Sequence, residues 1–240
     1  MNLAGGTVVA ITDASSGIGA ACAAAALDRR ARVVLGARRL ERLEAVVEKF
    51  DADRVVAART DVQRPEDSHE LVAAALAHFG KLRAFVANAG IGMYGGIMDN
   101  TDAEYAEMIM TNVAGTVRGV RAAVPALAGN GGGDIVIVAS VAGLRGGGNE
   151  AVYAATKFAQ VGLAGALDRE LRTKGIRVST VCPAAVETEF AIGKGRKAGD
   201  AWLRDVLRPE DIAHAVLTVL EQPRHVRTTQ WAMWAMAESS

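Results

Sequence analysis

Tyr153 and Lys157 are four residues apart in an Ala-rich segment whose pattern predicts a helix over residues 151–174. Residues spaced i, i+4 share one face of a helix, so the phenol and the ammonium lie side by side. An unperturbed phenol has a pKa of about 10, and a fixed positive charge beside it lowers that pKa. The pair could therefore act as a general acid or base near neutral pH. Because Tyr-x-x-x-Lys pairs are also common on protein surfaces, this interpretation needs support from other residues.

Two further polar residues supply that support. Ser140 directly follows an apolar run, residues 134–139, that predicts a buried strand. Asn112 lies among apolar neighbours inside a predicted helix over residues 103–128. A buried amide needs hydrogen-bond partners, so Asn112 belongs either to the same site or to the structural core.

The rest of the chain alternates short β-branched runs with longer helical patterns. Predicted strands cover residues 7–12, 32–36, 55–59, 84–87, 134–139, 176–181 and 229–233, and predicted helices cover 17–29, 39–50, 65–79, 103–128, 151–174 and 209–220. Strands that are apolar along their whole length, separated by helices, indicate a parallel sheet covered on both faces. We therefore expect a single-domain α/β protein over residues 1–240, with a doubly wound Rossmann fold and about seven strands.

The first strand ends in a glycine-containing loop before a helix begins, reading Thr12-Asp13-Ala14-Ser15-Ser16-Gly17-Ile18-Gly19. Ser15 or Ser16 is placed to cap the helix. Gly17 and Gly19 let the backbone approach a ligand, and the free N–H groups and dipole of a helix N-terminus favour a pyrophosphate. A lone Gly-x-Gly is typical of an ordinary tight turn, but the strand before it and the helix after it favour a dinucleotide.

The second strand ends in Gly36-Ala37-Arg38-Arg39, without the acid that usually bonds the ribose 2′-hydroxyl of NAD. A guanidinium pairs bidentately with phosphate, so Arg38 and Arg39 suit the 2′-phosphate of NADP. Alternatively, these arginines only begin an exposed helix that also carries Glu41 and Glu44. We expect NADP(H) as the preferred cofactor, with NAD(H) possible.

Other polar residues follow the third and fourth strands. Asp61-Val62 comes after the third strand and Asn88-Ala89-Gly90 after the fourth. Ligands of doubly wound sheets bind at the carboxyl ends of the strands, where these residues lie. Taken alone, each set is equally typical of a turn.

In this order and at these intervals, the residues resemble the short-chain dehydrogenases/reductases over nearly the whole chain. The loop from Thr12 to Gly19 resembles the family's cofactor loop, and Asp61-Val62 and Asn88-Ala89-Gly90 resemble its adenine-side motifs. The catalytic tetrad of the family is matched by Asn112, Ser140, Tyr153 and Lys157.

The resemblance implies a role for each tetrad residue. Tyr153 would protonate a carbonyl oxygen in reduction or deprotonate an alcohol in oxidation, while Ser140 hydrogen-bonds that oxygen. Lys157 would lower the Tyr153 pKa and bond the nicotinamide ribose. Asn112 would hold a water that links Lys157 to solvent.

The segment from Pro183 through Thr188 resembles the nicotinamide-side motif of the family, and the resemblance implies that Thr188 and the backbone at Val186 would hold the carboxamide. Two residues depart from the family pattern: Ala184 and Asp13 stand where glycines are expected. Ala184 adds one methyl to a turn. A carboxylate ~4 Å from a phosphate charge would cost about 1 kcal/mol in water and about 4 kcal/mol at an effective dielectric of 20. Asp13 could instead cap local N–H groups or bond an adenosine ribose hydroxyl.

These features predict an NAD(P)(H)-dependent oxidoreductase, of carbonyl reductase or alcohol dehydrogenase type, that interconverts a ketone and a secondary alcohol. Its pocket should be lined by residues 91–97, 141–150 and the segment after Thr188, which are mostly apolar. A non-catalytic dinucleotide sensor of the same fold is the alternative, and Asp13 is the residue that favours it. An epimerase or dehydratase is less well supported, because no additional acid/base pair marks one.

The segment Gly193-Lys194-Gly195-Arg196-Lys197 is basic and rich in glycine. No strand precedes it, and no Ser or Thr follows its Gly-Lys, so it is not a phosphate-binding P-loop. We expect a mobile lid over the cofactor, with a dock for an anionic acyl carrier or a plain solvated loop as alternatives.

The composition of the chain limits the kinds of molecule that are expected to bind it. The 240 residues carry 27 basic and 27 acidic side chains, and this balance argues against nucleic acid as a partner. The predicted helices over residues 103–128 and 151–174 are more apolar than one sheet face requires, which favours a homo-oligomer, either tetramer or dimer. No apolar run approaches the about 20 residues of a membrane span.

Cys22 and Cys182 are far apart in apolar runs, and the four histidines show no metal-ligand spacing, so no disulfide and no metal site is expected. The first residues lack a basic stretch of the kind found in signal peptides. We therefore expect a cytoplasmic protein without membrane attachment.

Overall fold

The structure is a computed structural model that describes residue 3 and residues 6–238. Its centre is a parallel sheet of seven strands in the order β3-β2-β1-β4-β5-β6-β7. The strands are β1 (Val8–Thr12), β2 (Arg32–Ala37), β3 (Val55–Arg59), β4 (Ala84–Ala87), β5 (Gly133–Val138), β6 (Ile176–Pro183) and β7 (Gln230–Met233).

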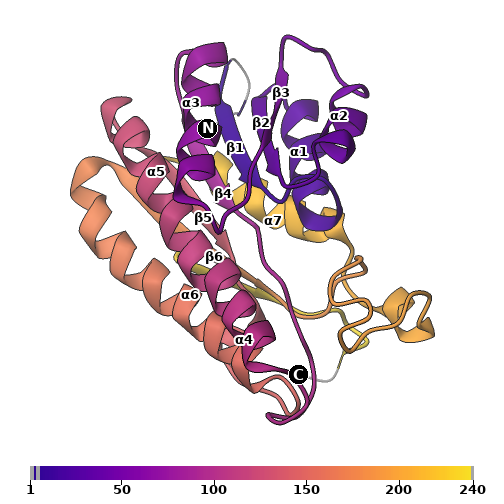
Figure 1. The fold of residues 1–240 in the computed structure, drawn as a ribbon. Coiled ribbons are helices and arrows are strands. Elements are labelled where there is room, and N and C mark those ends of the chain that lie inside the picture. The colour runs from indigo at the N-terminus through magenta and orange to yellow at the C-terminus, as the bar shows by residue number, and fades with distance from the viewer. Residues whose placement is uncertain (1–2, 4–5, 239–240) are drawn as a thin grey trace.

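Helices cover both faces of this sheet (Figure 1). One face packs against α1 (Gly17–Asp28), α2 (Leu40–Val47) and α7 (Pro209–Glu221), and the other against α3 (Pro65–Phe79), α5 (Thr116–Gly129) and α6 (Ala151–Leu171). The central strands are buried along their whole length and mostly apolar, because helices cover both faces of the sheet. The predicted doubly wound α/β fold is confirmed. In the described part of the chain, no helix is long and apolar enough to cross a membrane.

The long helix predicted over residues 103–128 is interrupted. The structure has α4 (Asp102–Ile109), then a π-helical segment η1 (Met110–Gly115), and then α5. The π turn frees the Asn112 carbonyl oxygen, which accepts from the Thr116 hydroxyl at 2.7 Å. Hydrophobic periodicity does not reveal such a turn, because it shifts the helical pattern by only one residue.

The order in which successive strands are added to the sheet reverses between β1 and β4, which are parallel neighbours in it. From β1 the sheet grows through β2 to β3, whereas from β4 it grows through β5 to β7. The loops that leave β1 and β4 therefore diverge and leave a crevice at the carboxyl edge of the sheet. The Thr12 hydroxyl joins the two strands there, accepting from the N–H groups of Asn88 and Ala89 at 3.0 Å each.

A buried ion pair stabilises the opposite edge of the sheet. Asp134, at the start of β5, accepts from the Arg177 guanidinium at 2.6 Å and from Arg224 at 2.8 Å. The Asp134 and Arg177 side chains are each 7% exposed, whereas Arg224 is 30% exposed. Arg177 also donates to three carbonyl oxygens that follow α7, so the pair ties β5 and β6 to the end of that helix.

We predict that Asp134→Ala lowers the free energy of unfolding by about 3 kcal/mol or more, because it leaves the buried Arg177 charge unpaired. Denaturant titration followed by circular dichroism measures this loss. The matched control is Asp51→Ala, which removes the exposed partner of Arg54 and should cost under about 1 kcal/mol. Equal losses for the two variants would contradict the prediction.

Candidate active site

A cleft of about 820 Å³ opens at the carboxyl edge of the sheet. This volume is within the range of ligand pockets. Most residues predicted for the site line it: Asp13, Ser16, Gly17, Ile18, Arg38, Arg39, Asn88, Gly90, Ser140, Tyr153, Lys157, Pro183, Ala184, Val186 and Thr188. A hollow of about 40 Å³ beside it is lined by Asp61, Val62 and Ala89, together with Asp13, Arg38 and Gly90. Thr12, Ser15, Gly19 and Asn112 are buried or nearly so behind these surfaces.

The loop between β1 and α1 has the shape of a phosphate cradle. Gly17 has φ +51°, and a Cβ at Gly19 would lie 2.3 Å from the Asp13 carbonyl oxygen, so both positions require glycine. Ser16 is the N-cap residue of α1, but its side chain makes no capping bond. The first N–H groups of α1 therefore remain available, and the cradle fits the pyrophosphate of a dinucleotide.

Asp13 adopts the backbone conformation that glycine would have at this position. Its φ is +52°, in the left-handed region that aspartate tolerates better than most residues. The residue keeps contact with solvent, yet it lies in a cleft whose walls disfavour its charge. This desolvation raises the pKa of Asp13, and the nearby Arg38 and Arg39 charges only partly oppose the rise.

The adenine-side motifs are held by local hydrogen bonds. The Asp61 carboxylate accepts from the Gln63 N–H at 3.0 Å, which is turn chemistry. The Asn88 amide donates to the carbonyl oxygens of Thr12, at 3.1 Å, and Asp13, at 3.3 Å. Asn88 therefore fixes the start of the cradle, while Asp61 shapes the wall of the smaller hollow.

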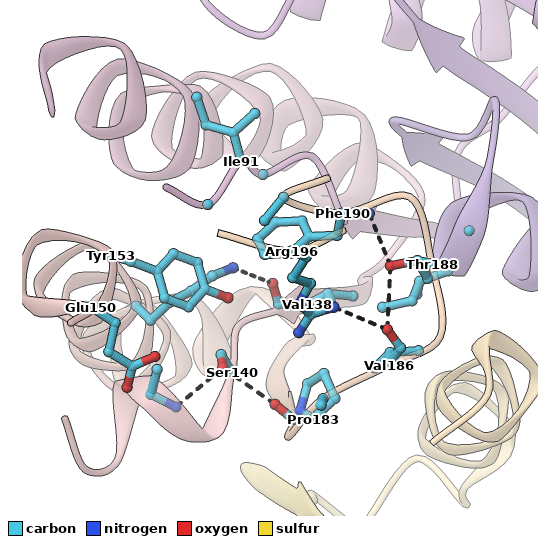
Figure 2. Close-up of a pocket in the computed structure, with 18 of the residues that line it drawn as sticks. Ile91, Val138, Ser140, Glu150, Tyr153, Pro183, Val186, Thr188, Phe190 and Arg196 are labelled. Atoms are coloured by element: carbon cyan, nitrogen blue, oxygen red, sulfur yellow. Dashed lines mark hydrogen bonds between the residues drawn. The ribbon is translucent and has the colours of Figure 1, made fainter. Parts of the chain in front are cut away.

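Tyr153 and Ser140 lie close together in the cleft (Figure 2). Lys157 also lines the cleft, and all three residues are buried. The Ser140 hydroxyl donates to the Pro183 carbonyl oxygen at 3.3 Å and accepts from the Ala142 N–H at 3.1 Å. The Lys157 ammonium donates to the Val138 carbonyl oxygen at 3.2 Å and lies 5.6 Å from the centroid of the Tyr153 ring.

The protonation of this cluster differs from the sequence-based expectation. Burial raises the pKa of Tyr153, and the Ser140 hydroxyl only partly offsets this rise. Burial also lowers the pKa of Lys157 to about 8, which weakens the positive charge expected to act on the phenol. The expectation that Lys157 lowers the Tyr153 pKa is wrong for this geometry, because desolvation is the larger effect. The Tyr153 phenol is therefore protonated at neutral pH.

Asn112 is fully buried behind this cluster. Its amide oxygen accepts from the Ile91 N–H at 2.8 Å, and its NH₂ group donates to the Ile91 carbonyl oxygen at 2.8 Å and to Thr156 at 3.0 Å. A Cβ at Gly90 would lie 3.4 Å from this amide oxygen and 3.5 Å from the Lys157 nitrogen, so the two groups are close together. Both polar ends of this side chain therefore have protein partners beside the Lys157 ammonium.

The segment from Pro183 to Thr188 closes the other side of the cleft. The Thr188 hydroxyl donates to the Val186 carbonyl oxygen at 3.5 Å and accepts from the Phe190 N–H at 3.2 Å. A Cβ at Gly17 would lie 3.1 Å from the Thr188 methyl, so this segment packs directly on the cradle. The Ala184 N–H donates to the Met233 carbonyl oxygen at 2.8 Å, and its methyl is accommodated without a positive φ.

Aromatic and charged residues surround the mouth of the cleft. The rings of Tyr94 and Phe190 each lie within 6 Å of the Tyr153 ring, measured between centroids. Glu150 and Arg196 also line the cleft. Glu150 ends the predicted lining segment 141–150, and Arg196 lies in the segment after Thr188, where a lid was expected. Ile192 of the same segment is 41% exposed and outside this lining.

The structure also addresses the metal and disulfide expectations. Among the residues that it describes, no group of His, Cys, Asp and Glu could hold a metal ion. Cys22 and Cys182 are both buried free thiols.

The fold is a doubly wound α/β fold, and known proteins share it. Residues 7–198 match the model of the short chain dehydrogenases. An uncharacterized oxidoreductase of Listeria innocua is 34% identical over 235 residues, covering 94% of this chain and 95% of that protein. The chain belongs to the short-chain dehydrogenase family and is an oxidoreductase of that family.

Solved structures agree with this assignment. An alcohol dehydrogenase from the archaeon Thermococcus sibiricus, complexed with 5-hydroxy-NADP, has a TM-score of 0.89 at 29% identity, covering 98% of this chain and 99% of that one. A 3-ketoacyl-(acyl-carrier-protein) reductase from Brucella melitensis, complexed with NADH, has a TM-score of 0.86 at 29% identity, covering 95% and 96%. The family resemblance seen in the sequence is confirmed.

We predict that Lys157 makes stability depend on pH above neutrality. The folded protein releases the Lys157 proton near pH 8, whereas the unfolded chain keeps it to about pH 10.5. The unfolded state therefore binds more protons in this window, and stability rises with pH across it. The unfolding free energy of wild type minus that of Lys157→Met should rise from pH 8 to pH 10 by an amount on the order of 2–3 kcal/mol.

Lys174→Met, at an exposed lysine, is the control and should show no such rise. Urea titrations at half-unit pH steps measure both differences. A flat difference for Lys157→Met would show that the buried ammonium keeps its ordinary proton affinity.

Proposed function

We propose that this protein is an NADP(H)-dependent oxidoreductase that interconverts a ketone and a secondary alcohol, with Tyr153 as the general acid or base. The observation that carries the proposal is the burial of Ser140, Tyr153 and Lys157 in one cleft beside the phosphate cradle. We also propose that residues 1–240 form one domain.

In this proposal the cofactor lies along the carboxyl edge of the sheet. Its pyrophosphate is held by the N–H groups at the start of α1, next to Gly17 and Gly19, and its carboxamide by Thr188 and the backbone at Val186. Asn88, Gly90 and Pro183 line the path between them, with Asp61 and Val62 beside the adenine. The bound nicotinamide supplies or accepts the hydride.

The side chains around the substrate oxygen move the proton. Ser140 positions the carbonyl oxygen by a hydrogen bond, and Tyr153 donates its phenolic proton to that oxygen as the alcohol forms. The raised pKa of Tyr153 supports the reductive direction, because the phenol is protonated at neutral pH. Lys157, with its pKa of about 8, is suited to return a proton to the phenol.

Arg38 and Arg39 support NADP(H) over NAD(H). Both are exposed at the end of β2, and both line the cleft. A 2′-phosphate between them would form charge-assisted hydrogen bonds to guanidinium groups. Structural relatives are complexed with both types of cofactor, so the preference rests on these two arginines.

Exposed apolar side chains support assembly into a homodimer or homotetramer. Ile109, Met110 and Phe158 are 47%, 37% and 47% exposed on α4, η1 and α6. The buried free thiols support a reducing compartment such as the cytoplasm.

A dinucleotide sensor without turnover is the second candidate, and Asp13 is the observation that favours it. A charged carboxyl group in the cradle weakens the binding of an anionic cofactor. An enzyme selected for fast turnover would not be expected to carry such a group there. Tests of Tyr153 and Asp13 separate the two candidates.

We predict that Tyr153→Phe lowers kcat for ketone reduction by about 10²- to 10⁴-fold, because it removes the proton donor while leaving the ring. Turnover is followed by NADPH absorbance with a panel of ketones, and NADPH affinity by calorimetry. Tyr105→Phe, on α4, is the control and should keep full activity. Full activity in Tyr153→Phe would disprove the mechanism, and cofactor binding without turnover in wild type would favour the sensor.

We predict that Asp13→Gly tightens NADPH binding by about 5- to 50-fold, because it removes a carboxyl group near the phosphates and frees Arg38 and Arg39. Asp13→Asn should give part of this gain, since it removes the charge and keeps the side chain. Calorimetry at pH 8 measures the affinities. Weaker NADPH binding in Asp13→Gly would show instead that Asp13 bonds the adenosine ribose.

A further inference from the structure

Arg196 carries a positive charge into the substrate side of the cleft. Its guanidinium carbon lies 5.4 Å from the ring centroid of Trp202, 5.7 Å from that of Phe190 and 5.8 Å from that of Tyr94. One nitrogen donates to the Val186 carbonyl oxygen at 3.2 Å. Figure 2 shows the side chain lying across the centre of the cleft, between Tyr153 and Val186.

Two other basic groups around this end of the cleft have acidic partners, whereas Arg196 has none among the ion pairs of the described residues. Lys194 pairs with Glu104, and Arg42 pairs with Glu189 at 3.0 Å. Among the ion pairs of the described residues, none includes Arg196. The charge of Arg196 is therefore stabilised by aromatic faces and a carbonyl oxygen, but it is not neutralised.

Carboxyl groups also border this end of the cleft, but among the described residues none of them forms an ion pair with Arg196. Glu150 lines the cleft, but one of its carboxylate oxygens accepts from the Gly147 N–H at 2.7 Å. Glu107 also lines the cleft but makes no ion pair with Arg196, and Glu189 is bound to Arg42. One guanidinium nitrogen of Arg196 donates to the Val186 carbonyl oxygen, and a guanidinium has further N–H groups that match a carboxylate bidentately.

The position of Arg196 relative to Tyr153 sets the spacing of the groups that a substrate would carry. The Tyr94 and Phe190 rings each contact both residues, with centroids 5.6 Å and 5.8 Å from that of Tyr153. Arg196 and Tyr153 therefore share two aromatic neighbours in the cleft. The Arg196 charge also acts on Tyr153, since it favours the phenolate and lowers the raised pKa of Tyr153 slightly.

We propose that Arg196 is a specificity-determining residue that binds a carboxylate of the substrate, which makes the substrate class short oxo acids and the matching hydroxy acids. The carbonyl carbon would lie at Tyr153 and Ser140, the carboxylate at Arg196, and the intervening carbons against Tyr94 and Phe190. The inference rests on the proposed oxidoreductase function and specifies its substrate.

The test compares substrates that differ only in charge. Wild type should reduce 3-oxobutanoate or 4-oxopentanoate with a kcat/KM about 10- to 100-fold above that for the corresponding methyl ester, from one charge-assisted contact. Arg196→Gln should abolish this preference by lowering kcat/KM for the acids, while kcat/KM for the esters changes less than about 3-fold. Retained ester turnover also shows that the variant is folded.

Two further variants make the test specific. Arg145→Gln removes another positive charge that lines the cleft, and it should leave the preference for acids intact. Arg196→Lys keeps the charge without the planar fork and should restore part of the preference. Equal loss of acid and ester turnover in Arg196→Gln, loss of the preference in Arg145→Gln, or absence of a preference in wild type would overturn the proposal.

Equilibrium binding distinguishes failure of this inference from failure of the proposed oxidoreductase function. Trp202 lies against Arg196, so its fluorescence reports on this site, and Trp202→Phe identifies its part of the signal. If neither acid nor ester is reduced, the oxidoreductase proposal fails, and binding alone then decides the inference. The inference is supported if 4-oxopentanoate quenches the fluorescence, the ester does not, and the quenching disappears in Arg196→Gln. It is overturned if the acid causes no quenching in wild type.

Discussion

The buried amide of Asn112 joins three parts of the chain that the site needs in register. It exchanges two hydrogen bonds with the backbone of Ile91 after β4, and it donates a third to Thr156 on α6, between Tyr153 and Lys157. Its own carbonyl oxygen, freed by the π-helical turn, accepts from Thr116 and from Gln160 on α6. An unpaired amide in this position would be costly, so α6 can dock only where these bonds form. That docking sets the depth at which the phenol and the ammonium enter the cleft.

The depth of α6 decides the protonation chemistry. A tyrosine and a lysine on an exposed helix face would keep their ordinary proton affinities. Here both groups are buried, and burial disfavours the charged form of each, so the pKa of the phenol rises and that of the ammonium falls. A neutral phenol next to a lysine that readily loses its proton is an arrangement for donating protons. The carbonyl oxygens of Val138 and Pro183 complete it by orienting Lys157 and Ser140.

The cofactor half of the site was largely predictable because its residues follow strands. A parallel sheet brings the carboxyl ends of its strands to one edge, so Asp13, Asn88, Ser140 and Pro183 had to converge. The substrate half follows no such rule. Arg196 reaches the cleft through a loop between β6 and α7 whose path depends on packing against Tyr94, Phe190 and Trp202. The pKa of Tyr153 was mispredicted for a related reason, since spacing reveals which charges are near but not how much water is excluded.

Asp13 shows how a residue can depart from a motif and keep the backbone geometry. Glycine is favoured there because the chain must adopt φ near +50°, and aspartate reaches φ +52° at modest cost. The conformational requirement is met, so the consequence of the departure is electrostatic. The carboxyl group lies near Arg38 and Arg39 and competes for the charge that a 2′-phosphate would use. Desolvation raises the pKa of this carboxyl group, and the charges of Arg38 and Arg39 oppose the rise. The backbone shape of the cradle is therefore kept without the first glycine, whereas its charge is changed.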